Sequence, residues 1–90
     1  MDRFIVIHAV KPGVSQDEAW ESCHKLATTS VKGAKWLRSY FVAERDEIIC
    51  DWEAPDEASI RESIAAADRE RLLPIKEVCT AVYFGPEFFK

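Results

Sequence analysis

The spacing of hydrophobic residues changes several times along the chain, and each change marks the border of a predicted element. Residues 4–10 are apolar at nearly every position, are rich in Ile and Val, and stop at Lys11-Pro12-Gly13. This pattern predicts a strand buried on both faces and followed by a turn. Apolar residues then recur at helical spacing over residues 19–27. Ser15 and Glu18 have the spacing of a capping box, which predicts that a helix begins there.

The rest of the chain predicts a hairpin, a second helix and a last strand. Residues 35–43 and 47–53 have the pattern of strands and are joined by a short polar turn, so they are expected to pair as a hairpin. Asp56 is suited to cap the helix that follows. A fourth strand is predicted for residues 76–84, ended by Gly85-Pro86.

The order of these elements is β-α-β-β-α-β, which we assign to a single domain of residues 1–90. Two right-handed crossovers around a central hairpin give an α+β fold of the ferredoxin-like type. The predicted sheet is four-stranded and antiparallel, with strand order 4-1-3-2 and both helices on one face.

Two helices cover only one face of such a sheet, so the other face should be polar if the protein is a monomer. The first strand is instead largely apolar on both sides: Phe4, Val6 and His8 alternate with Ile5, Ile7 and Ala9. We expect the first of these two sets to lie on the open face. A large exposed apolar surface usually marks an interface or a ligand cavity. We therefore predict a homodimer in which two open sheet faces close into a dimeric α+β barrel.

Composition narrows the classes of partner and cofactor. The chain is 48% hydrophobic and 31% charged, as in folded domains, and its net charge of −4 provides no basic surface for a phosphate backbone. Neither nucleic acid nor a membrane is therefore an expected partner. Three cysteines without a CxxC pair suit reduced thiols, and no signal peptide is recognisable, so a cytoplasmic location is predicted. With three glycines and no glycine-rich fingerprint, no nucleotide cofactor is expected.

Polar side chains interrupt the apolar ones on the face that we assign to the dimer interior. His8, Asp51, Glu53 and Cys79 lie on strands that are neighbours in the predicted sheet, so we expect them to converge. Imidazole, carboxylate and thiolate together favour nickel, copper or zinc over magnesium or calcium. These residues are the predicted ligands of a divalent transition metal. The alternative for His8 is a hydrogen-bonded histidine of the core, because a shift of one residue in register exchanges the two faces.

A second hypothesis uses the same cavity for a small molecule. Arg38 and Tyr40 are two residues apart on one strand, so they share a face and could hold the anionic oxygen of an aromatic or carbonyl compound. His8 would then act as general base near neutral pH. Alternatively, Arg38 neutralises Asp51 or Glu53 across the hairpin. No catalytic sequence motif is present, so the residues predict no particular reaction.

Short motifs between residues 34 and 78 carry a resemblance to a known family. They are Trp36-Leu-Arg-Ser39-Tyr40, Cys50, Glu53-Ala54-Pro55-Asp56, Ile60-Arg61, Leu73-Pro74 and Glu77-Val78. In these motifs the chain resembles the DUF4242 family of small ferredoxin-like proteins, which includes a nickel-binding member. The resemblance implies a homodimeric α+β barrel that holds nickel ions and has no established reaction. The chain departs from the family pattern at Arg38, where members often carry a histidine, and a guanidinium repels a metal ion.

Overall fold

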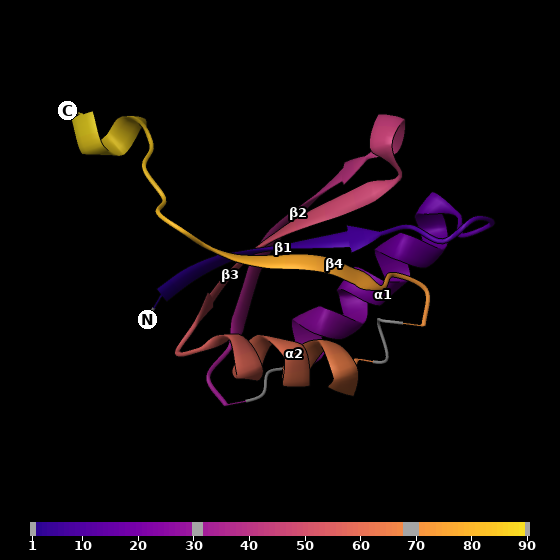
Figure 1. Ribbon diagram of the computed structural model, residues 1–90, viewed down its shortest axis with the longest axis horizontal. Coiled ribbons are helices and arrows are strands. Elements are labelled where there is room, and N and C mark those ends of the chain that lie inside the picture. Colours follow the sequence, from indigo (N-terminus) through magenta and orange to yellow (C-terminus); the bar gives the residue numbers. More distant parts are fainter. Residues whose placement is uncertain (1, 30–31, 68–70, 90) are drawn as a thin grey trace.

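Helices and strands follow the predicted order (Figure 1). The computed structural model of the chain describes residues 2–29, 32–67 and 71–89. Its elements are β1 (Asp2–Ala9), α1 (Gln16–Thr28), β2 (Lys35–Val42), η1 (Ala43–Arg45), β3 (Glu47–Ala54), α2 (Glu57–Ala66), β4 (Ile75–Ala81) and η2 (Pro86–Phe89), where η denotes a 3₁₀ helix.

The strands form one antiparallel sheet in the order β2-β3-β1-β4, as predicted. Both helices lie on the same side of this sheet (Figure 1), so the other face is left open by α1 and α2. This arrangement confirms the ferredoxin-like α+β fold. It also places β1 in the middle of the sheet, between β3 and β4, while β2 and β4 are the edge strands.

Local side-chain hydrogen bonds explain where the helices begin. The Ser15 hydroxyl accepts from the Glu18 backbone N–H at 3.1 Å, and the Glu18 carboxylate accepts from the Ser15 N–H at 3.0 Å, which confirms the predicted capping box. Asp56 caps α2 by accepting from the backbone N–H of Ser59 at 2.8 Å. The hydroxyl and the backbone N–H of Ser59 lower the pKa of Asp56, because they stabilise its charged form.

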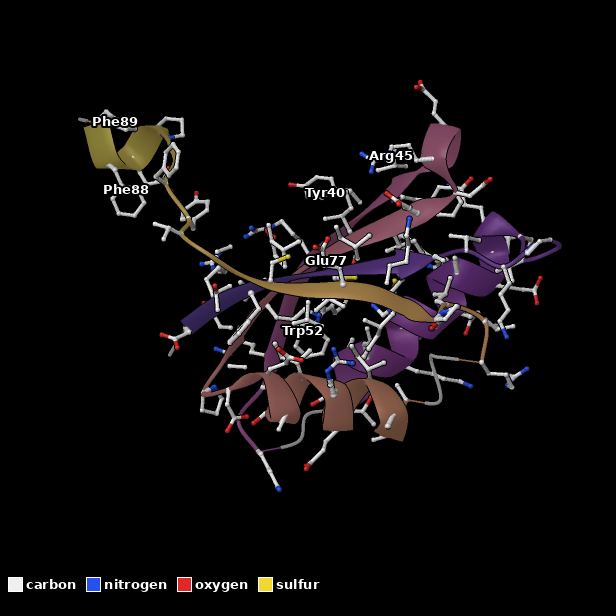
Figure 2. All side chains as sticks on the ribbon, viewed as in Figure 1. Tyr40, Arg45, Trp52, Glu77, Phe88 and Phe89 are labelled. Atoms are coloured by element: carbon white, nitrogen blue, oxygen red, sulfur yellow. The ribbon has the colours of Figure 1, made fainter. Side chains whose placement is uncertain are left out.

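The core lies between the sheet and the two helices. Trp52 of β3 points to the helix side (Figure 2) and is almost fully buried. Ile60 and Ile64 of α2 are buried on the same side, together with Leu73, which shortly precedes β4. Ile60 and Ile64 are four residues apart, a spacing that places both side chains on the same face of the helix.

Two details of the sequence prediction are wrong. On β1, Phe4, Val6 and His8 lie under the helices, whereas Ile5 and Ile7 lie on the open face. Alternation separates these two sets but does not say which set the helices cover when both are apolar. The last strand ends at Ala81 instead of residue 84. Ala81 pairs with Arg3 near the beginning of β1, so the residues that follow run past the end of the neighbouring strand.

The buried carboxylate of Glu47 joins β3 to β4 and to the 3₁₀ helix η1. Glu47 begins β3, and its two carboxylate oxygens lie 3.1 Å from the Arg45 guanidinium and 2.5 Å from the Lys76 ammonium. The hydrogen bond from Lys76, followed by the charges of Arg45 and Lys76, lowers the pKa of Glu47 against the opposing effect of burial. The pairs tie β4 to β3 across the end of β1.

We predict that Glu47→Gln lowers the melting temperature at pH 7, because both cations lose their anionic partner. The stability that Glu47 contributes is fully present above its ordinary pKa of 4.5 and is lost as the pH falls through the lowered pKa of the folded state. The difference in melting temperature between wild type and variant should therefore shrink in acid. Thermal unfolding followed by circular dichroism at stepped pH measures it. An equal difference at neutral and strongly acidic pH would contradict this assignment.

Candidate functional site

The open face of the sheet carries most of the residues that were predicted to form a site. Ile5 of β1 lies directly opposite Asp51 of β3 on one side and opposite Cys79 of β4 on the other. Arg3 faces Glu53 in the same way. Residues opposite each other in an antiparallel pair share a face, so these polar side chains surround half-buried isoleucines on the open face.

A β-bulge in β2 places Trp36 and Arg38 on different faces of the sheet. Trp36 pairs with Trp52 and lies on the helix side, but the register shifts before Arg38, which pairs with Asp51 and lies on the open face. Tyr40 pairs with Ile49 and is exposed on the open face. Tyr40 and Glu77 both point to the side of the sheet away from α2 (Figure 2).

Both predicted acidic ligands are paired with arginines. The Arg38 guanidinium lies 2.8 Å from the Asp51 carboxylate, and the Arg3 guanidinium lies 3.8 Å from that of Glu53. The cross-strand neutralisation of Asp51 by Arg38 is thus confirmed. A metal ion that used either carboxylate would have to compete with a cation of the chain itself.

Cys79 is half-buried on the open face, next to Glu77 on the same strand. Burial raises the pKa of the Cys79 thiol, and the negative charge of Glu77 and its hydrogen bond with the thiol raise it further. Cys79 is therefore a thiol at neutral pH. Because a metal ion binds the thiolate, binding at Cys79 would release a proton.

His8 does not lie with the other three predicted ligands. It is fully buried on the helix side of β1, opposite Ile48 and Ile75, and its Nδ1 donates to the backbone carbonyl of Leu73 at 2.8 Å. The expectation that it faces the dimer interior is wrong, and the alternative of a hydrogen-bonded core histidine is confirmed. The error follows from the reversed faces of β1.

The donors of the described residues do not form a complete metal centre. Within residues 2–29, 32–67 and 71–89, no three His, Cys, Asp or Glu side chains lie close enough together to hold an ion. Asp51 and Cys79 are separated by the width of β1, so their backbones are about two strand spacings, roughly 10 Å, apart. Metal–ligand bonds are only about 2.0–2.3 Å long, so the resting arrangement brings too few donors to one point.

Sequence reasoning missed a groove on the helix side. The groove lies between α1 and the edge strand β2, has a volume of about 640 Å³, and is lined by aromatic and thiol side chains that include Trp20, Cys23, Trp36 and Phe41. Trp36 is held there by a hydrogen bond from its indole N–H to Ser39 at 2.8 Å. The available signal was the pair of tryptophans, Trp20 on the predicted helix and Trp36 on the predicted strand, since the sequence does not show that Trp20 stays exposed.

Fold and open face together define a small α+β protein with a ferredoxin-like sheet. A family model described as "Nickel responsive protein SCO4226-like" matches residues 4–78, from β1 into β4, and the chain belongs to this family. No curated protein and no solved structure gives a significant match. The family supports the predicted relation to nickel, while the narrower DUF4242 relationship stays a prediction. None of the helices in the described ranges is long and apolar enough to span a membrane.

The buried position of His8 gives a test of its structural role. We predict that His8→Ala lowers the free energy of unfolding by about 2–4 kcal/mol, because it opens a cavity and leaves the Leu73 carbonyl without this donor. His24→Ala, at the exposed histidine of α1, is the matched control and should change stability by less than about 0.5 kcal/mol. Urea unfolding measures both variants. Equal effects of the two substitutions would show that His8 is not a core residue.

Proposed function

We propose that the protein is a small nickel-binding homodimer of the cytoplasm, with its metal donors on the open face of the sheet. Membership in a nickel-responsive family supports the metal. The observation that carries the proposal is the combination, on one uncovered face, of half-buried isoleucines with the thiol and carboxylates of Cys79, Asp51 and Glu53. Cysteines outside disulfides suit a reducing compartment such as the cytoplasm.

The charge pairs favour burial of this face against a second copy. Unpaired charges are costly to remove from water, but Arg38 with Asp51 and Arg3 with Glu53 enter the interface as neutral pairs. The isoleucines between them gain from burial by roughly 25 cal/mol for each Å² of apolar surface. A two-fold interface uses the same patch on both copies, so one surface serves both sides.

A second copy also addresses the shortage of donors. Each open face contributes Cys79 and the neighbouring Glu77, which is exposed and is not among the paired carboxylates described above. Two facing sheets double the number of thiols and carboxylates near one interface. We therefore assign the metal to the dimer rather than to one chain, with Asp51 and Glu53 able to join only if their arginines move. His8 is excluded from this set by its burial on the other side.

The alternative of an aromatic or carbonyl ligand in the sheet cavity has weaker support. The Arg38 guanidinium, which would orient the ligand together with Tyr40, is already bound to Asp51. The base proposed for that chemistry, His8, lies on the opposite side of the sheet. A ligand of this kind would therefore have to displace one ion pair and would lack its predicted base.

The homodimer predicts a mass of about 20 kDa by sedimentation equilibrium at micromolar concentration, twice the chain mass of 10.3 kDa. Ile5→Asp places an unpaired charge in the middle of the open face and should yield a monomer. Ala65→Asp, which adds the same charge on the exposed side of α2, is the matched control and should remain dimeric. Circular dichroism verifies that both variants are folded. A monomeric wild type would remove the proposed dimer.

Nickel binding is tested by equilibrium dialysis with Ni²⁺. Cys79→Ser should weaken binding by about tenfold or more, because a thiolate ligand is lost, whereas Cys23→Ser should not. His8→Ala should also bind normally at a temperature where circular dichroism shows that it is folded. Affinity should rise with pH, since the raised pKa of Cys79 makes the proton a competitor of the metal. Binding weaker than about 100 μM in wild type, or equal binding by the Cys79 and Cys23 variants, would contradict the proposal.

A further inference from the structure

The chain continues past β4 into a segment that exposes large apolar side chains. This C-terminal knob comprises residues 82–89 and runs away from the sheet and from α1 (Figure 1). Val82, Phe84, Phe88 and Phe89 are 85%, 72%, 63% and 77% exposed. Phe88 and Phe89 lie at the far end of the molecule (Figure 2). A concentration of exposed aromatic surface in one short segment indicates a binding element.

The knob is held in shape by its own contacts. The Tyr83 hydroxyl donates to the Glu87 carboxylate, the Phe88 N–H donates to the Gly85 carbonyl at 3.0 Å, and the rings of Tyr83 and Phe88 meet edge to face. A Cβ atom at Gly85 would lie 2.6 Å from the Tyr83 hydroxyl and from a Glu87 carboxylate oxygen, so the missing side chain leaves room for the hydrogen bond between them. The Arg3 guanidinium lies 4.8 Å from the Tyr83 ring centre and links the knob to β1.

These contacts matter for binding because a segment that is already ordered loses less entropy when it docks. The internal contacts of the knob therefore favour its binding to a partner surface. Its internal contacts involve Tyr83, Gly85, Glu87 and Phe88, while Phe84 and Phe89 remain mostly exposed. The knob does not bury these two rings, so contact with an apolar surface elsewhere would remove them from water.

The groove between α1 and β2 has the complementary properties. Its volume of about 640 Å³ falls within the range of ligand pockets, about 300–1,000 Å³, and would accept more than one aromatic ring. Trp20 on one wall is 74% exposed, and Trp36 and Phe41 line the other. Cys23 lies in the groove and is outside any disulfide.

We propose that the C-terminal knob of one copy inserts aromatic side chains into the α1–β2 groove of a second copy. Within one chain the knob leaves from β4, whereas the groove lies at β2, the opposite edge of the sheet. The knob also runs away from α1 (Figure 1), so it is directed away from the groove of its own chain and the groove of a second copy can receive it. Two copies give two knobs and two grooves, which allows a closed, reciprocal exchange. The inference rests on the homodimer of the proposed function and adds a second contact to it.

Disulfide trapping in the protein of residues 1–90 tests this contact. The substitution Phe89→Cys places a thiol at the end of the knob and leaves Phe84 and Phe88 in position. Under mild oxidation the variant should form a covalent dimer, seen on a non-reducing gel, through the new thiol at position 89 of one copy and Cys23 of the other. Adding Cys23→Ser should abolish the dimer. Adding Cys79→Ser, on the open face, is the matched control and should leave it intact.

Each other outcome contradicts the inference in a recognisable way. A covalent dimer that survives Cys23→Ser but not Cys79→Ser would place the knob on the partner's open face. One that survives both would mean that the two knobs meet each other. An internal disulfide in a monomer would mean that the knob folds back onto its own chain. If no disulfide forms, sedimentation separates the causes: a persistent dimer overturns only the knob contact, whereas a monomer overturns the proposed homodimer as well.

Discussion

The structure depends on β1, a central strand that is apolar on both sides although the helices cover only one. Phe4 and Val6 pack under the helices with Trp52, and this side builds the core. Ile5 and Ile7 on the other side are left half-buried by the chain itself. Because β3 and β4 pair with β1, their open-face residues are arranged around these isoleucines. The helices thus cover the apolar residues on one side of the sheet and leave those on the other side uncovered.

The two arginines of the open face determine which of its carboxylates are available to a ligand. Arg38 of β2 and Arg3 of β1 pair with the two carboxylates of β3 that were predicted as metal ligands, and they neutralise the charge of these carboxylates. Neutral pairs suit burial in an interface better than lone carboxylates. On β4, Glu77 and Cys79 lie next to each other on the same face, and no arginine pair involves them among the ion pairs described above. The proposed nickel donors therefore lie at the edge strand β4, away from the hairpin of β2 and β3.

The sequence predicts the fold well because its signals are local. Ser15 and Glu18 define a helix start, the polar turn defines the hairpin, and β-branched runs define strands, so order and topology follow. The site depends on register, which no local signal determines. Asp51 and Cys79 share a face as predicted, but His8 has the other parity and lies in the core. The α1–β2 groove depends on how far the helices cover the sheet, and the hydrophobic pattern does not show this. The end of β4 depends on where its neighbour β1 begins.

The central claim is that a second copy covers the open face, and the reactivity of Cys79 tests it most directly. Cys79 is half-buried on this face, whereas Cys50 lies in the core of the same chain. The rate of alkylation of Cys79 by a maleimide should therefore fall as protein concentration rises, while Cys50 stays unreactive throughout. Mass spectrometry after a timed reaction gives both rates. An alkylation rate of Cys79 that does not change with protein concentration would contradict the account.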